Sequence, residues 1–515
     1  MAPESGIRLR SSALILVLSG LTLVLGFAVQ VALAATLGTS REMDIFLVAV
    51  TLPTLLTAVS LAVSTGFLVP ALNERVSARG GEAATALAAV AVRRSALAAL
   101  AIVAALEVAA VPSIRVVAPG LDPGAVRDAA VLLRIMLVGS FFDLMRGVLT
   151  AIQYWRERFF LAQLVPSLNH AVLIVSALFL LKRFGLVGLA AGWTAGSLVM
   201  AAVLVPAVRG LGALGAERRA HGMAAGSLGG KLLPVLIVAA LVQFAPVVDR
   251  LVASLLPIGS ISYLGYGSKM LEILMRMVPM AVALAAFPVL SRQAAEADLD
   301  GFRRTTVAGL RWALLGAVPL ALIVLVFRVE IVRVLFQRGA FDADATRNVA
   351  QACGWYAAAY VPATVVFLLN YICFALKKQW FLAGVGFASL ALTAILDVAF
   401  TRAWGFVGVA VAFLAVSVIQ VAILAVPLQL RRRILSGARL LPFAAQVGGA
   451  CVAMFAVWAG ARPLTGAWSA ALPAVSLAVN ALAGLAAFVL VLWWLRNPDL
   501  RALLDKGSGR LGRAL

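Results

Sequence analysis

The stretch of sequence that decides the fold occurs twice. Residues 158–164 read RFFLAQL and residues 379–385 read QWFLAGV, whereas residues 185–193 read GLVGLAAGW and residues 405–413 read GFVGVAVAF. The two matches are offset by 221 and 220 positions, so the chain contains an internal repeat. In each copy, the matched residues belong to two consecutive apolar segments.

Apolar segments of this kind run along the whole chain. A bilayer core needs roughly 20 apolar residues per helix, and Pro257 with Gly259 predicts a turn that separates two of the segments. Counting on this basis gives fourteen spans, at residues 12–36, 44–70, 88–112, 128–153, 159–181, 185–208, 230–256, 262–290, 305–327, 346–376, 380–401, 405–429, 440–460 and 470–495. The repeat shifts the chain by six spans, which preserves direction through the membrane and makes the repeat parallel.

We therefore predict an all-α polytopic membrane protein with about 14 transmembrane helices, arranged as two parallel six-helix lobes around a central cavity plus two C-terminal helices. The predicted domains are an N-lobe at 1–210 with helices 1–6, a cytoplasmic linker at 211–230, a C-lobe at 231–430 with helices 7–12, and a segment at 431–515 with helices 13–14 and a cytoplasmic tail.

Composition supports the membrane assignment. Of the 515 residues, 63% are hydrophobic and 13% are charged, and the mean hydropathy is +1.04, which leaves too little polar surface for soluble domains. The net charge of +21 does not indicate nucleic acid, because the basic residues are scattered between the spans. Counting Lys and Arg with the N-terminus inside gives 26 on one side and 11 on the other, so both termini are predicted to be cytoplasmic.

The sequence offers no support for an enzyme. The stretch GSLGGKLLP at 226–234 lacks the spacing of a phosphate-binding loop, and His170 and His221 belong to no metal-binding motif. Cys353, Cys373 and Cys451 all lie in apolar stretches, where we interpret them as packing residues. A transporter without nucleotide chemistry is driven by an ion gradient or by the membrane potential.

Charged residues inside the spans are the candidates for function, since each costs roughly 2.5–3.5 kcal/mol at the bilayer centre on insertion scales. The eighth span carries Lys269, Glu272 and Arg276 at spacings of three and four, which puts them on one helical face. Two interpretations stay open. Lys269 and Glu272 form a self-neutralising pair, or the three residues form a cationic wall for a phosphorylated substrate.

The other charged candidates in the spans are Glu107, Arg134, Asp143, Arg146, Asp249, Arg250 and Asp397. Asp143 and Arg146 share a face, where they form a local ion pair or a functional group. Asp249 and Arg250 are neighbours and point to different faces, so one of them is expected to face the cavity. Asp397 has no cation within one turn on its own helix, and it is therefore either protonated or coordinating a cation.

Several motifs occur together with these charges. The chain reads LGTSREMDIFLVAVTLP at 37–53, VDRLVASLLPIGSISYLGYGSKMLEI at 248–273, FPVLSR at 287–292 and FQRGAFDADAT at 336–346. In combination and in this order they resemble the MurJ (MviN) family of lipid II flippases, and the resemblance covers essentially the whole chain. That family belongs to a superfamily with the MATE drug exporters and the polysaccharide flippases. The resemblance implies a bacterial cytoplasmic (inner) membrane protein.

The resemblance also implies a substrate site, although this chain departs from the family pattern at several of its positions. Members move a polyprenyl-diphosphate-linked saccharide, and the positions that carry over most directly are Asp44, Lys269 and Glu272. With Arg276, Arg146 and Arg250, these form the expected substrate-binding set. Family arginines on helices one and two are replaced, by Leu23, Val29 and Thr57, and Lys269 stands where the family has arginine.

Some members place a monovalent cation in the C-lobe, using acids on helices seven and eleven. Asp249 and Asp397 resemble those acids, and Thr393 is the third expected ligand although it stands where the family often has Asn. Na⁺ or H⁺ is then the expected coupling ion, and no other cofactor is expected. The first hypothesis is a flippase for an undecaprenyl-diphosphate-linked saccharide, most simply lipid II, that works by alternating access. The alternatives are a flippase for another lipid-linked glycan such as an exopolysaccharide or O-antigen unit, a MATE-like cation-coupled exporter of small molecules, and a non-transporting scaffold of the envelope glycan synthesis machinery.

Overall fold

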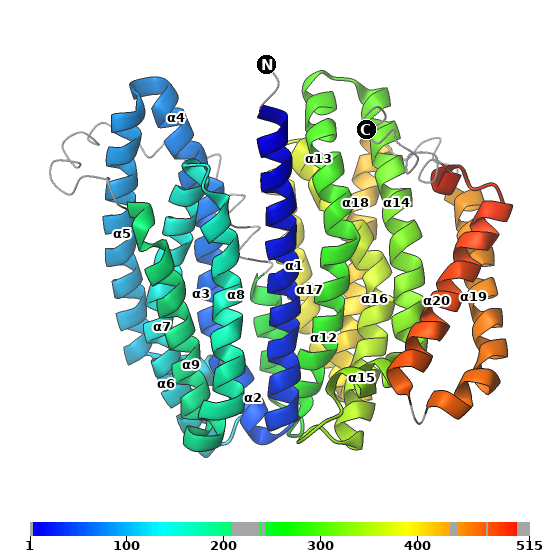
Figure 1. The fold of residues 1–515 in the computed structure, drawn as a ribbon, viewed down its shortest axis with the longest axis horizontal. Coiled ribbons are helices and arrows are strands. Elements are labelled where there is room, and N and C mark those ends of the chain that lie inside the picture. The colour runs from blue at the N-terminus through cyan, green and yellow to red at the C-terminus, as the bar shows by residue number, and fades with distance from the viewer. Residues whose placement is uncertain are drawn as a thin grey trace. The chain divides into compact units, whose positions relative to one another are not determined.

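The computed structural model describes residues 4–208, 237, 241, 243–432, 440–469 and 472–501, and every regular element within these ranges is a helix (Figure 1). The predicted linker at 211–230 and the tail after residue 501 lie outside them. The N-terminal elements are α1 (Glu4–Leu37), α2 (Arg41–Ala49), α3 (Thr51–Val63), the π-helix η1 (Ser64–Leu68), α4 (Val69–Arg79), α5 (Gly81–Val108), α6 (Ala110–Val117), α7 (Pro123–Trp155), α8 (Phe159–Val175), the π-helix η2 (Ser176–Leu180), α9 (Leu181–Leu204) and the 3₁₀-helix η3 (Val205–Val208). The later elements are α12 (Ser260–Met277), α13 (Pro279–Ala295), α14 (Leu299–Val326), α15 (Arg328–Phe336), α16 (Ala343–Ala375), α17 (Gln379–Trp404), α18 (Val407–Arg432), α19 (Leu440–Ser469) and α20 (Pro473–Trp494).

Contacts divide the chain into two compact units. The first unit comprises Met1–Ser262 with Arg338–Phe341, and the second comprises Tyr263–Gln337 with Asp342–Leu515. The division falls after Ser262 because residues shortly before it bond to the early helices, as described below. The predicted domain boundaries describe the repeat rather than the contacts, and they stay a prediction.

Twelve helical stretches among the described residues are long and apolar enough to cross a membrane. One of them, Phe159–Leu204, has 46 residues, about 69 Å of helix, which suffices for two crossings of a core of about 30 Å. It is interrupted at Gly185, whose backbone angles are non-helical (φ 60°, ψ −152°). The predicted span at 230–256 is described only in part, at residues 237, 241 and 243–256. These two facts account for the difference from the expected fourteen.

The backbone confirms the internal repeat. Helices α7 and α16 each have 33 residues, and an aspartate caps each N-terminus. The caps are Asp122 and Asp342, 220 positions apart, and each carboxylate accepts the N–H three residues later. Such a cap satisfies a donor that the helix leaves free.

The connections after these helices repeat as well. Glu157 and Lys377 adopt positive φ of 57° and 56° at the two helix ends, and Gly185 and Gly405 adopt 60° and 59° further on. Both pairs are again 220 positions apart. Turns that need these backbone conformations are therefore placed identically in the two copies.

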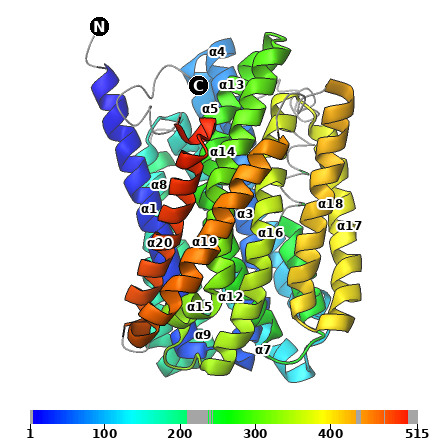
Figure 2. The same ribbon diagram turned by 90° about the vertical axis from the view of Figure 1, so that its right-hand side faces the viewer.

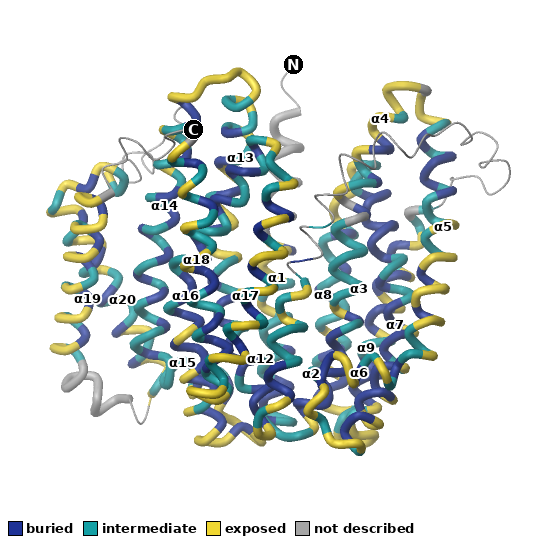
Figure 3. Tube along the Cα trace, turned by 180° about the vertical axis from the view of Figure 1, so that it is seen from behind, coloured by how far each residue is buried: buried dark blue, intermediate teal, exposed yellow. Residues whose placement is uncertain are grey.

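The burial of the helices also repeats between the two copies. Of the candidate spans, α7 is the most buried and α16 follows it, so each is the central helix of its unit. Figure 3 shows α7 mainly buried, whereas the loop between α4 and α5 is exposed.

In the second unit, α19 and α20 lie side by side (Figure 2). Trp458 of α19 donates from its indole N–H to the Asn480 carbonyl at 2.9 Å and lies against Gly484, where a side chain would collide with the ring.

Candidate functional site

The first group of polar contacts surrounds Asp44, near the start of α2. Ser40 caps this helix, and Asp44 is 5% exposed. Its carboxylate accepts the Gly259 N–H at 2.6 Å, the Ser262 N–H at 2.8 Å and the Ser262 hydroxyl. Gly259 has φ 93°, so the turn predicted from Pro257 and Gly259 is confirmed. This carboxylate is therefore held by hydrogen bonds from a segment about 215 positions away.

Two more contacts join the same segments. Arg250 donates from Nη1 to the Thr51 hydroxyl at 2.6 Å. The Gly120 N–H donates to the Ser254 hydroxyl at 3.2 Å, and a Cβ at Gly120 would overlap the Ser254 carbonyl. Glycine is thus required at this position because two backbones touch.

A fourth segment adds one more contact to this group. The Ala340 N–H donates to the Ala35 carbonyl at 2.9 Å, and the flanking glycines Gly38 and Gly339 both have φ 59°. We call the residues that make these contacts the closure cluster: Ala35, Asp44, Thr51, Gly120, Arg250, Ser254, Gly259, Ser262 and Ala340. All of them belong to the first unit.

An exposed ion pair lies on two of the same segments. Arg41 donates from Nη2 to both carboxylate oxygens of Asp122 at 2.8 Å, and Asp122 also caps α7. These hydrogen bonds, the one from Arg41 above all, hold the pKa of Asp122 below its ordinary value. Asp122 is therefore ionised over the whole physiological pH range.

A second polar group is embedded in the middle of the first unit. Arg146 donates from Nε to Asp143 at 3.2 Å, and the two side chains are 10% and 2% exposed. The Ser197 hydroxyl of α9 donates to the other oxygen of Asp143 at 2.9 Å. Of the two sequence interpretations for this pair, the structure thus contains the ion pair, and it adds Ser197 as a third member.

The second unit carries the charged face of α12. Glu272 accepts from Lys269 Nζ at 2.8 Å and from Arg276 Nη2 at 2.9 Å, and the three side chains are 40–61% exposed. One carboxylate is therefore shared by two cations. The face contains the Lys269–Glu272 pair of the first interpretation and keeps one net positive charge. The second interpretation, a cationic wall for a phosphorylated substrate, stays a prediction.

The three expected cation ligands are divided between the units. Asp397 and Thr393 are both buried on α17, one turn apart, in the second unit, whereas the half-buried Asp249 belongs to the first. Within the described ranges, no three His, Cys, Asp or Glu side chains gather closely enough to hold a metal ion. A site that uses two carboxylates with a hydroxyl stays a prediction.

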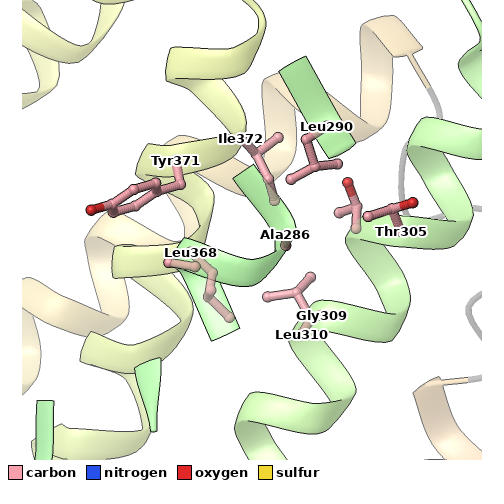
Figure 4. Close-up of a pocket in the computed structure, with 10 residues that line it drawn as sticks. Ala286, Leu290, Thr305, Gly309, Leu310, Leu368, Tyr371 and Ile372 are labelled. Carbon is pink, nitrogen blue, oxygen red and sulfur yellow. The ribbon is translucent and has the colours of Figure 1, made fainter. Parts of the chain in front are cut away.

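A small pocket lies in the second unit, between α13, α14 and α16 (Figure 4). Its wall is mainly apolar, with hydroxyl groups on a few side chains. The lining residues are Ala283, Ala286, Leu290, Thr305, Thr306, Gly309, Leu310, Leu368, Tyr371 and Ile372. No charged side chain contributes to it, so it does not suit an ionic headgroup.

Sequence reasoning missed the partners in the closure cluster. Gly259, Ser262, Ser254 and Gly120 act through backbone N–H groups and small hydroxyls, which leave no periodic signal. The one signal in the sequence was the predicted topology, which places residues near 40, 120, 260 and 340 on the same side of the membrane.

A family model described as lipid II flippase MurJ matches residues 33–478. The chain belongs to the MurJ family. It is therefore a multi-pass membrane transporter and not an enzyme, as predicted. A lipid II flippase MurJ of Burkholderia cenocepacia is 28% identical over 66% of this chain and 69% of its own length. A probable lipid II flippase MurJ of Vibrio cholerae is 27% identical over 35% of this chain and 34% of its own length.

Solved structures confirm the fold. A lipid II flippase MurJ in an inward closed conformation superimposes with a TM-score of 0.78, at 19% identity, over 94% of this chain and 99% of its own. An inward-facing MATE multidrug transporter of the MOP superfamily gives a TM-score of 0.68, at 15% identity, over 81% of this chain and 95% of its own. At these identities the likeness concerns the fold alone, and it supports the predicted MurJ-like architecture.

Proposed function

We propose that this MurJ-family chain moves an undecaprenyl-diphosphate-linked saccharide, most simply lipid II, across the bacterial cytoplasmic membrane by alternating access. The observation that carries the proposal is the face of α12, where Lys269 and Arg276 share Glu272 and leave one net positive charge inside a membrane span. Such a charge is costly in lipid and needs water or an anion, and a diphosphate is an anion. The remaining members of the proposed substrate-binding set are Arg146, Arg250 and Asp44.

The closure cluster supports the proposal that transport proceeds by alternating access. Its contacts join four connections of the first unit, which the predicted topology puts on the extracytoplasmic side of the membrane when both termini are cytoplasmic. Asp44 then acts by holding the closure, and Arg250 shares this role through Thr51. Na⁺ or H⁺ at Asp249, Asp397 and Thr393 would couple the transition to a gradient, since an ion that prefers one state shifts the equilibrium.

One observation favours a second candidate, a flippase for another lipid-linked glycan. Leu23, Val29 and Thr57 stand where the resemblance places arginines, so a different headgroup would meet a less cationic first unit. Other envelope-glycan proteins are further candidate partners of either flippase.

Complementation separates the two candidates. The chain should restore growth to cells depleted of their own lipid II flippase, and the control is a strain depleted of an O-antigen flippase. Rescue of the control strain alone, with the protein present in the membrane at normal amounts, would assign the second candidate. Reporter enzymes fused to each terminus test the cytoplasmic orientation, which an extracytoplasmic signal from either fusion would contradict.

A further inference from the structure

The buried triad of Asp143, Arg146 and Ser197 has an internal comparison within the same chain. The repeat offset of 220 maps these residues onto Ala363, Val366 and Ser417. The mapping is sound because the helix caps and the positive-φ residues obey the same offset. Both serines have the carbonyl four residues earlier, at 193 and 413, within hydrogen-bonding distance, and these carbonyls are also 220 apart. The single hydroxyl proton of Ser197 is shared between that carbonyl, at 3.1 Å, and the Asp143 carboxylate, at 2.9 Å.

The second copy therefore builds the same helix pair without the ion pair. Helix α16 makes its most extensive contact with α18, just as α7 does with α9, although Ala363 and Val366 occupy the equivalent positions. Burying an ion pair usually gives no more stability than apolar residues of similar volume. The fold thus has no need for Asp143 and Arg146, and their presence requires another explanation.

The geometry of Arg146 supplies one. A guanidinium has five N–H donors, and Nε is the one that Asp143 engages. Within the described ranges the two Nη groups have no hydrogen-bond partner, while a tenth of the side chain remains accessible. Asp143 is itself oriented by Ser197. The guanidinium is thus fixed at one nitrogen and keeps two donor groups for an oxyanion, which planar guanidinium binds in a bidentate manner.

We propose that Asp143 and Ser197 are positioning residues that hold the Arg146 guanidinium inside the first unit as a binding group for the diphosphate of the carried lipid. The inference rests on the proposed function and deepens it, since it assigns the first unit its own phosphate contact. Arg146 touches the substrate, and Asp143 acts only through Arg146.

The test uses the purified full chain and undecaprenyl diphosphate as the probe, with undecaprenol as the uncharged control ligand. The variant D143A/R146V copies the residues of the second repeat. It should keep its cooperative thermal unfolding and its affinity for undecaprenol, and it should bind the diphosphate about tenfold to a hundredfold more weakly, the range for hydrogen bonds to a charged group. A folded variant with wild-type diphosphate affinity overturns the proposal. A variant that fails to unfold cooperatively also overturns it, because the pair would then be structural.

A thermodynamic cycle tests the positioning role. Asp143→Ala should weaken diphosphate binding in the wild type and have no further effect when Arg146 is already alanine, whereas Asp143→Glu should restore most of the affinity. Equal effects of Asp143→Ala in both backgrounds would contradict a role through Arg146. Flipping of lipid II by the wild type in liposomes is measured separately. Wild type that binds the diphosphate without flipping lipid II contradicts the proposed function and leaves this inference intact.

Discussion

The charged face of α12 shows how a single residue can set the charge of a site. Glu272 neutralises one of its two cations, so replacing either cation leaves the group neutral. A neutral group has no electrostatic reason to attract a diphosphate. Lys269 is the more informative of the two, because its side chain is less exposed than that of Arg276.

We expect Lys269→Ala to reduce lipid II flipping to below about a tenth of the wild-type rate, and Lys269→Arg to keep or raise it, because arginine preserves the charge and adds a bidentate fork. Flipping of fluorescent lipid II in liposomes measures this. Arg347→Ala is the matched control, since Arg347 pairs with Asp344 on an exposed turn of α16. Wild-type flipping by the alanine variant would remove Lys269 from the site.

At the scale of an element, the cap of α7 depends on pH. Arg41 keeps the pKa of Asp122 below its ordinary value, so the contribution of this pair to stability is complete above the unfolded pKa of about 3.9 and is lost as the pH falls through the lower folded value. Asp122→Asn removes the charge and keeps a capping oxygen. Its thermal midpoint should lie below that of the wild type at pH 7, and the difference should narrow as the pH falls below about 4. A constant difference down to pH 3 would show that the charge is not involved.

The equivalent cap of α16 tests how much a capping carboxylate contributes in the second copy of the repeat. Asp342 accepts the Ala345 N–H at 2.7 Å. Asp342→Ala should lower the free energy of unfolding by about 1 kcal/mol, the usual cost of losing an N-cap. Chemical unfolding in detergent measures this, with Asp344→Ala as the control within the same first turn. No change in Asp342→Ala would mean that the end of α16 does not depend on its cap.

The elements also show what the sequence could reveal. The repeat was predictable, because Gly185 and Gly405 are each followed by a similar apolar run, and turns need glycine at positive φ. The position of Lys269, Glu272 and Arg276 on one face followed from helical spacing alone. The bonds of Asp44 to Gly259 and Ser262 did not, since backbone donors can belong to any residue type and the contact spans about 215 positions.

For the whole molecule, the coupling hypothesis concerns Asp397, which is fully buried on α17 with Thr393 one turn before it. A bound Na⁺ or proton would offset the cost of burying this acid. Asp397→Asn should therefore weaken the dependence of flipping on Na⁺ or on pH while leaving thermal unfolding cooperative. Flipping in liposomes under imposed gradients decides this, and an asparagine variant with unchanged ion and pH dependence would exclude Asp397 from coupling.

Alternating access requires that the closure cluster open during each cycle. The backbone bond of 2.9 Å between Ala35 and Ala340 brings these residues close enough for a disulfide. In a background without the native cysteines, A35C/A340C should form a disulfide under oxidation. Flipping should then fall to below about a tenth of the rate of the reduced variant. The reason is that opening would require breaking a covalent bond, which is far stronger than hydrogen bonds worth about 1 kcal/mol each. A reductant should restore transport, and each single cysteine variant should be insensitive to oxidation. Cross-linked protein that flips lipid II at the reduced rate would show that transport proceeds with the cluster closed, in which case Asp44, Arg250 and their partners stabilise a permanent part of the fold rather than a state of the cycle.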